Sequence, residues 1–204
     1  MSNNGTAKRL EPGDRRDQIV RIAGGIFSSD GYDKASMSGI AKQAGVTRAL
    51  VYHYFPDKAA LFEAVLRAEA DALLAATRLD ATLPPLENIR RAISAYLIHF
   101  SPASDKAPNL HAQADAQPAM TGRIRGANHA ILAQRVTRAL SVEGDALTHA
   151  AIVAWLEFVT ALARETSATP DIDREAVVDL SVATLRAIVP AAAALLHQAP
   201  LPGR

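Results

Sequence analysis

Apolar residues recur three or four positions apart along most of the chain, and this spacing places them on one face of a helix. The first such set is Ile19, Ile22, Ala23, Ile26 and Phe27, and a later one is Leu61, Phe62, Val65 and Leu66. No run of four or more residues alternates apolar and polar side chains between turn residues, which is the pattern of a strand. The pattern therefore predicts an all-α protein.

Helix-capping residues divide the first third of the chain into four predicted helices. Asp14, Ser36, Thr47 and Asp57 each precede a helical pattern and can accept hydrogen bonds from its free backbone N–H groups. The predicted helices are 14–30, 37–44, 48–54 and 58 to about 77. Glycine follows two of them, at Gly31 and Gly45, where a left-handed conformation commonly ends a helix.

Prolines and glycines separate the helical patterns in the rest of the chain, beginning with the break at Leu83-Pro84-Pro85. The predicted helices are 86–100, 109–116, 123–141, 145–167 and 174–196. Pro190 falls inside the last pattern, so that helix either kinks there or ends early. Residues 1–13 are expected to be a disordered arm, and 199–204 a frayed tail.

The two short helices at 37–44 and 48–54 fit a helix-turn-helix. Ile40, Ala41 and Ala44 supply the small and branched side chains that the first helix needs for packing. Gly45 permits the sharp turn, and Val46 is placed to fill the gap between the helices. The second helix then carries polar and aromatic groups that could enter a major groove.

These residues resemble the N-terminal DNA-binding domain of the TetR family of transcriptional regulators. The shared features are the Ile-Ala…Ala-Gly-Val core, the Tyr-x-x-Phe end of the second short helix and the Asp-Lys that follows. They lie within GYDKASMSGIAKQAGVTRALVYHYFPDK, residues 31–58. The resemblance covers about Arg15 to Leu66, a quarter of the chain. It implies a DNA-binding domain at 14–60 and a larger helical ligand-binding and dimerisation domain at 61–198.

The resemblance also implies roles in DNA binding for individual residues. Thr47 and Arg48 would touch phosphate and nearby base edges, and Tyr52 would donate its hydroxyl to a phosphate. Ser36 and Lys58 would contact phosphates, while His53 and Tyr54 could contact sugar, phosphate or base. Ala49 and Leu50 depart from the usual pattern at the same helix, and Leu50 could contact a thymine methyl. The expected DNA-binding residues are Ser36, Thr47, Arg48, Ala49, Leu50, Tyr52, His53, Tyr54 and Lys58.

Charge and composition agree with a DNA-binding N-terminal part joined to a nearly neutral remainder of the chain. The net charge is +1, which excludes a uniformly basic binder. The first 60 residues hold nine basic and six acidic residues, and the other 144 hold thirteen and fifteen. There is no cysteine, which excludes disulfides, thiolate metal sites and a cysteine nucleophile.

A cytoplasmic protein is expected from the distribution of apolar residues. The N-terminus lacks the apolar core of a signal peptide. The longest apolar run, Ala150 to Ala163, is shorter than the ~20 residues that span a bilayer.

The run Ala150 to Ala163 is apolar almost all round, which indicates burial on nearly every side. One side can pack on its own domain, and another on a second subunit. Together with the last helix, it could form a four-helix interface in a homodimer. The alternative is that both helices are core of a monomer.

An apolar ligand pocket with a few polar groups is expected among the larger side chains of the C-terminal part. Each of these residues could instead be ordinary core. A carboxylate in the apolar run, Glu157, needs an arginine such as Arg135 or Arg164, solvent, or an amine-bearing ligand. The candidate ligand-binding residues are Tyr96, His99, Phe100, His111, Met120, Trp155, Glu157 and Phe158.

No catalytic motif or phosphate-binding glycine loop occurs in the sequence. His111 and Asp115 lie one helical turn apart, but two ligands are too few for a metal site. No metal or cofactor is therefore expected, and the chain is not expected to be an enzyme.

The hypothesis from sequence is a homodimeric regulator, most often a repressor, that binds a palindromic operator and is released by a small, largely apolar ligand. One alternative keeps the DNA-binding module but gives the C-terminal domain only dimerisation or a protein partner. A helical-bundle enzyme with a fortuitous helix-turn-helix is the third possibility.

Overall fold

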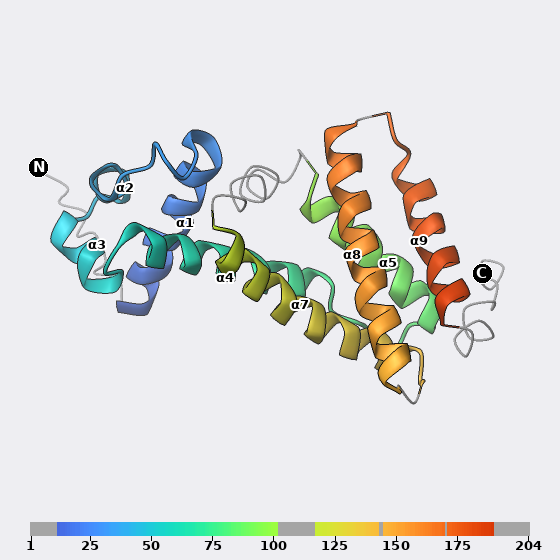
Figure 1. Ribbon diagram of the computed structural model, residues 1–204. Coiled ribbons are helices and arrows are strands. Elements are labelled where there is room, and N and C mark those ends of the chain that lie inside the picture. The colour runs from blue at the N-terminus through green and yellow to red at the C-terminus, as the bar shows by residue number, and fades with distance from the viewer. Residues whose placement is uncertain (1–11, 102–116, 143–144, 170, 190–204) are drawn as a thin grey trace, which may run out of the picture.

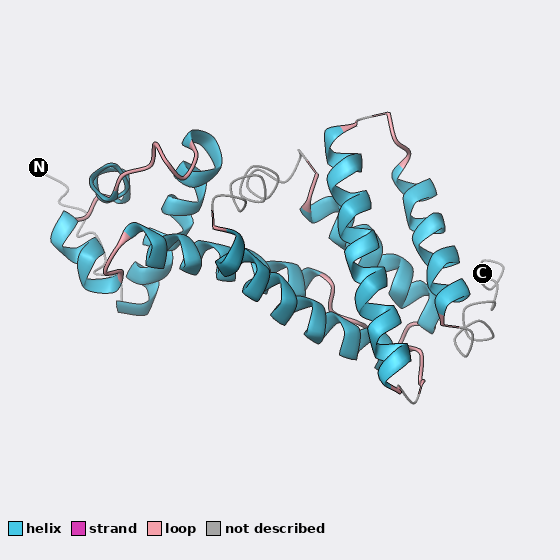
Figure 2. Ribbon diagram, viewed as in Figure 1, coloured by secondary structure: helices cyan, strands magenta, loops and turns pink. Residues whose placement is uncertain are grey.

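The computed structural model describes residues 12–101, 117–142, 145–169 and 171–189. These residues form helices and connecting loops, with no strand among them (Figure 2). The prediction of an all-α fold is confirmed. The helices are α1 Pro12–Asp30, α2 Met37–Ala44, α3 Arg48–Tyr54, α4 Lys58–Ala76, α5 Pro85–His99, α7 Pro118–Ala139, α8 Ala146–Ala168 and α9 Arg174–Ile188.

The first four helices begin and end close to where their capping residues predict. The side chains of Ser36, Thr47 and Asp57 each accept a backbone N–H at the start of α2, α3 and α4. Gly45 ends α2 with φ of 65° in the left-handed region, where a residue with a Cβ is strained. Only α1 differs, because it starts at Pro12 rather than Asp14. Local chemistry therefore accounts for the helix-turn-helix.

Helices α1 to α3 and the first part of α4 share one apolar core. Phe27 of α1 and Phe62 of α4 are fully buried, with ring centroids 5.0 Å apart in an edge-to-face arrangement. Ile40 of α2 and Val51 of α3 are also fully buried in this cluster. The inner faces of α2 and α3 are thus used for packing, and their outer faces remain available.

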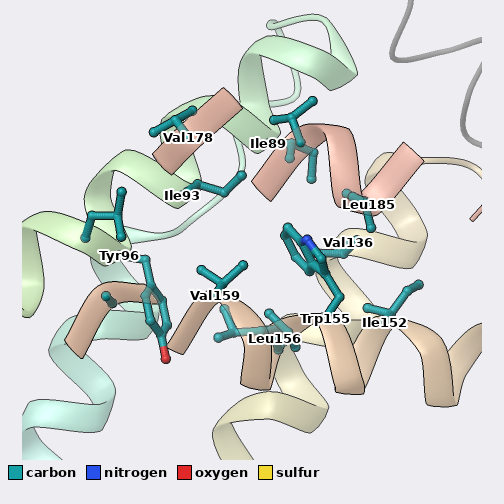
Figure 3. Packing of buried hydrophobic residues seen from close by; sticks show 14 of the residues in the cluster. Ile89, Ile93, Tyr96, Val136, Ile152, Trp155, Leu156, Val159, Val178 and Leu185 are labelled. Atoms are coloured by element: carbon teal, nitrogen blue, oxygen red, sulfur yellow. The ribbon is translucent and has the colours of Figure 1, made fainter. Parts of the chain in front are cut away.

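A second core lies at the opposite end of the molecule, where α5, α8 and α9 pack with the C-terminal part of α7 (Figure 1). Trp155 is buried at its centre and donates its indole N–H to the carbonyl oxygen of Ser181, 2.8 Å away. Figure 3 shows Ile152, Leu156 and Leu185 around this ring. The hydrogen bond satisfies the one polar atom of the tryptophan and fixes α8 against α9.

Two long helices connect the two cores. In α4, Leu61 to Leu66 belong to the first core and Leu73 to the second. Helix α7 packs along α4, and its Met120 and Ile124 rest on the first core while Leu132 is buried in the second. A movement of either helix therefore affects both ends of the molecule.

Helix α7 begins earlier than the predicted 123–141. Its first residue is Pro118, and Gly122, which the sequence marks as a break, lies inside the helix. Proline is well accommodated in the first turn because its missing N–H has no helical partner there. The last described helix ends at Ile188, ahead of Pro190. The predicted helix 109–116 lies outside the described residues.

Helix α8 has 23 residues. It is longer than the apolar run Ala150 to Ala163, which by itself is too short to span a bilayer. With a mean hydropathy of 1.6 over its most apolar window, it is long and apolar enough to cross a membrane. A core helix passes the same test, and one face of α8 is core. Its buried residues are Ile152, Trp155, Leu156, Val159, Thr160 and Ala163.

Candidate nucleic-acid interface and adjoining pocket

Helix α3 turns one face to the core and the other to solvent. Val51 is fully buried, and Phe55, which caps the helix, is nearly so. Thr47, Arg48, Ala49, Tyr52 and His53 are exposed on the opposite side. The helix lies at the end of the molecule remote from α9 (Figure 1), so nothing in the described chain blocks its approach to a groove.

Arg48 and Tyr52 form a pair on this exposed face. An Arg48 guanidinium nitrogen donates to the Tyr52 hydroxyl over 3.4 Å, and its carbon lies 5.3 Å from the ring centroid. Because the hydroxyl oxygen accepts from Arg48, its own hydrogen remains available to donate. A hydroxyl and a guanidinium held together in this way suit contacts with phosphate oxygens.

The two capping hydroxyls have a free hydrogen as well. Ser36 Oγ accepts the N–H of Gly39 over 3.1 Å, and Thr47 Oγ1 accepts that of Leu50 over 3.2 Å. Each hydroxyl can therefore still donate to an outside acceptor. Capping the helix and contacting a phosphate are compatible roles for both residues.

Lys58, for which a phosphate contact is expected from the sequence, is hydrogen-bonded within the fold. Its ammonium donates to three backbone carbonyls, those of Tyr32, Asp33 and Ala35, at 2.9, 3.4 and 3.2 Å. It also lies 4.4 Å from the ring centroid of Tyr32. An ammonium has three donors, so these carbonyls use all of them. Lys58 therefore joins the α1–α2 connection to the start of α4.

The remaining candidates on α3 lie nearer the core. Leu50 and Tyr54 are half-buried, and Tyr54 packs against the first core with its ring 5.3 Å from that of His53. His53 itself is exposed. The arrangement leaves Thr47, Arg48 and Tyr52 as the most accessible polar groups of the helix.

A pocket lies between α4, α5, α7 and α8, where the two cores meet. It holds about 660 Å³ of empty space, with its open mouth included. Most of its lining is apolar, and two of the apolar residues, Leu66 and Ile124, also pack in the first core. The lining residues are Leu66, Glu69, Ala70, Leu73, Tyr96, His99, Phe100, Thr121, Ile124, Arg125, Asn128, His129, Leu132, Thr160 and Arg164.

A chain of polar groups, buried except for Glu157, runs along one side of this pocket. Thr160 donates to the carbonyl of Leu156, so the Tyr96 hydroxyl donates to Thr160 Oγ1 over 2.7 Å. His129 Nε2 lies 3.3 Å from the same Thr160 oxygen. On the other side of the ring, His129 Nδ1 lies 3.2 Å from a carboxylate oxygen of Glu157. Three helices, α5, α7 and α8, are joined by this chain.

Burial controls the protonation of these groups. It raises the pKa of Tyr96 to about 12, against a smaller lowering effect of the hydrogen bond to Thr160. Burial also lowers the pKa of His129, although the nearby Glu157 carboxylate opposes this. His99 has its pKa lowered by burial as well. All three side chains are therefore neutral at neutral pH.

Only part of the predicted ligand-binding set lines this pocket. Tyr96, His99 and Phe100 do, and the stacked rings of Tyr96 and Phe100 lie 5.0 Å apart. Trp155 is core and lines a second cavity. The other members lie elsewhere: Met120 packs on the first core, Phe158 packs half-buried on the second, Glu157 is exposed, and His111 lies outside the described residues.

Glu157 has partners other than the arginines that the sequence suggested. Its carboxylate lies 3.6 Å from Arg125 and 3.2 Å from His129, both on α7. Arg135 instead donates to the carbonyl of Leu74 over 2.6 Å. The pairing depends on the rotation of α7 against α8, which helical periodicity within either segment does not reveal.

Sequence reasoning missed the residues that α7 and α8 contribute, including Arg125, His129, Thr160 and Arg164. A histidine or threonine on the apolar face of a helix was the available signal. Thr160 interrupts the apolar run of α8, and His129 falls at the same face as Leu132 and Val136. The contacts of Thr160 with Tyr96 and with His129 join residues more than 30 positions apart, which sequence periodicity does not reveal.

One known protein family matches this chain, over its helix-turn-helix region. A family model described as bacterial regulatory proteins, tetR family, covers residues 19–65. The whole fold is similar to the crystal structure of a tetR-family transcriptional regulator from Streptomyces coelicolor, with a TM-score of 0.78 at 23% identity. That similarity covers 94% of this chain and 92% of the other. Residues 19–65 therefore form a TetR-type regulatory-protein region, and the chain as a whole has the fold of a tetR-family regulator.

Curated relatives of the same type match less than half of this chain in the two cases that follow. The transcriptional activator FasR of Mycolicibacterium smegmatis is 34% identical over 95 residues, 46% of this chain and 43% of FasR. The transcriptional repressor KstR2 of the same organism is 32% identical over 81 residues, 39% of this chain and 40% of KstR2. The matched segment thus spans less than half the length of either relative.

The family match places residues 19–65 with the corresponding region of bacterial regulatory proteins of the tetR family. FasR is an activator and KstR2 a repressor, so similarity to them leaves the sign of regulation open. Among the residues that the structure describes, no three histidines, aspartates or glutamates gather as they would around a metal ion.

Proposed function

We propose that this protein is a cytoplasmic homodimeric repressor of the TetR type, which binds a palindromic operator and is released by a small, largely apolar ligand. The observation that carries the proposal is the exposed Arg48–Tyr52 pair on α3, a helix whose other face is fixed in a core. A rigid helix with polar groups along its free face suits insertion into a major groove.

Binding as a dimer is supported by apolar side chains left exposed on α8 and α9. Leu180 on α9 is 49% exposed, and Leu147 at the start of α8 is 77% exposed. Alanines flank both, with Ala154 on α8 and Ala183 on α9 open to solvent. Small residues allow two helices to approach closely, so these faces suit a four-helix contact with a second copy.

Control by a ligand is supported by the position of the pocket. Leu66 and Ile124 line the pocket and also pack in the DNA-binding core. A molecule that enters between α4 and α7 must displace these side chains or the helices that carry them. The displacement would alter the spacing of the two α3 helices in the dimer, and so the fit to two half-sites.

Linkage sets the size of this effect. The free energy by which the ligand prefers the released state equals the binding free energy that the operator complex loses, typically about 1–3 kcal/mol. A pocket that opens between the two cores favours this account over a C-terminal domain that only dimerises.

The DNA contacts are tested by operator affinity measured across a series of salt concentrations. We expect Arg48→Gln to weaken binding and to reduce the salt slope by about one ion. Tyr52→Phe should weaken binding about tenfold, because it removes a donor to a charged acceptor. Arg138→Gln, an exposed arginine near the far end of α7, is the matched control. Unchanged affinity in both α3 variants would remove the proposed interface.

A further inference from the structure

Two side chains of the pocket beside α4 separate it from a neighbouring cavity. Tyr96 and Leu132 line this pocket, and they also line a second cavity of about 420 Å³, openings included. Trp155, Leu156 and Val159 line only the second cavity. Figure 3 shows Tyr96 beside Val159 and Leu156, with Trp155 beyond them. Tyr96 and Leu132 therefore form a wall between two neighbouring apolar spaces.

Hydrogen bonding holds this wall in place. The Tyr96 hydroxyl is bound to Thr160, and only about 5% of the Tyr96 surface is exposed. Leu132 is 6% exposed and packs in the second core. An apolar chain that fills the first pocket would end against these two side chains.

The outer rim of the same pocket carries positive charge. Arg125 on α7 and Arg164 on α8 both line it, and both lower the pKa of the Tyr96 hydroxyl against the larger effect of burial. Arg125 is paired with Glu157 at 3.6 Å. Arg164 is exposed and has no ion pair with any residue in the described ranges. The acidic lining residue, Glu69, already has an interaction within the chain.

We infer that the ligand is a slender apolar carboxylate, bound with its carboxylate at Arg164 and its chain directed at the Tyr96–Leu132 wall. The inference rests on the proposed function, since it names the chemical class of the proposed effector. Guanidinium groups bind carboxylates through paired, charge-assisted hydrogen bonds. An ammonium head would instead face two arginines.

The wall limits the length of the chain. Affinity should rise about fourfold for each methylene buried, until the chain reaches Tyr96 and Leu132. Beyond that length a further methylene finds no room, and affinity levels off or falls. Shortening Leu132 should open a path into the second cavity and move this limit to longer chains.

The test of the head group compares straight-chain carboxylates with alcohols and amines of equal length, by calorimetry on the full chain. We expect the carboxylate to bind most tightly. Arg164→Gln should weaken the carboxylate about tenfold and leave the alcohol unchanged. Arg138→Gln, an exposed arginine of α7 outside this pocket, should change neither.

The test of the wall uses Leu132→Ala, with the milder Leu132→Val in case the larger cavity unfolds the protein. The protein has a single tryptophan, so its emission reports on Trp155 alone. Long carboxylates should change that emission in the Leu132 variants and not in the parent. An unchanged length limit in a folded variant overturns the placement of the chain.

Three results overturn the carboxylate class: equal or tighter binding of the alcohol or amine, no effect of Arg164→Gln, or no binding of any probe. Operator release is measured separately with the same probes. Release by the alcohol alone refutes the carboxylate class and leaves the proposed function standing. A carboxylate that binds without releasing DNA supports the class and counts against ligand control.

Discussion

Lys58 shows how a residue that suits DNA by sequence can be used inside the fold. Its ammonium reaches the carbonyls of Tyr32, Asp33 and Ala35, which end the connection between α1 and α2. These carbonyls belong to residues 23 to 26 positions away, so helical spacing around Lys58 gives no hint of them. The Asp-Lys sequence pattern identifies the position, but only the tertiary structure identifies its partners.

Replacing Lys58 by methionine should therefore act on stability more than on DNA contacts. The apolar stem is retained while three carbonyls lose their charged donor, so we expect a loss of about 1–3 kcal/mol in the free energy of unfolding. Thermal or urea unfolding measures it, with exposed Lys42→Met of α2 as the control. A salt slope reduced by one ion in a variant of unchanged stability would show that Lys58 contacts phosphate instead.

His129 should make stability depend on pH. Burial lowers its pKa in the folded protein, so below the ordinary histidine pKa of 6.5 the unfolded chain binds the proton more readily. The free energy of unfolding should therefore fall as the pH drops from neutral through that value, until the folded pKa is passed. Melting temperatures measured from neutral pH to about pH 5 show the trend.

The matched control for this pH effect is the exposed His53. His129→Gln should flatten the profile, while His53→Gln should keep it. His99 leaves a residual slope, because burial lowers its pKa too. A His129→Gln profile as steep as that of the parent would assign the effect to other groups.

At the scale of the elements, capping chemistry predicted the helix-turn-helix well. Ser36, Thr47 and Asp57 each occupy the cap that the sequence assigned to them. The prediction was poorer where a breaking residue is tolerated, as with Gly122 inside α7. The pocket was only partly predictable, because it depends on how α7 faces α4 and α8 and not on the periodicity of any single helix.

Helix α7 offers a specific test of coupling between the pocket and the first core. Ile124 lines the pocket and packs on the first core, so Ile124→Ala should weaken the contact through which ligand binding affects that core. We expect the ratio of operator affinities without and with a releasing ligand to shrink toward one, from a coupling of about 1–3 kcal/mol. Ile98→Ala, at an exposed isoleucine of α5, should leave the ratio unchanged. An undiminished ratio in Ile124→Ala would place the coupling elsewhere.

At the scale of the whole molecule, the exposed apolar face of α9 is the proposed dimer interface. Replacing Leu180 by arginine should not harm a monomer, because the side chain is 49% exposed. It should break a dimer that buries the residue, and light scattering after size-exclusion chromatography measures the change in mass. Ile131→Arg, at a 40% exposed isoleucine of α7, is the matched control. Leu180→Arg that stays dimeric would exclude this face as the interface.

Two copies of a short α3 helix on one site are the centre of this account, because one such helix offers few polar contacts. Selection of genome fragments by the purified protein at a stated salt concentration tests it most directly. We expect enriched fragments that share a palindrome, with half-sites about one turn of the DNA helix, ~10 base pairs, apart. Failure to enrich any double-stranded DNA, or a shared sequence without two-fold symmetry, would contradict it.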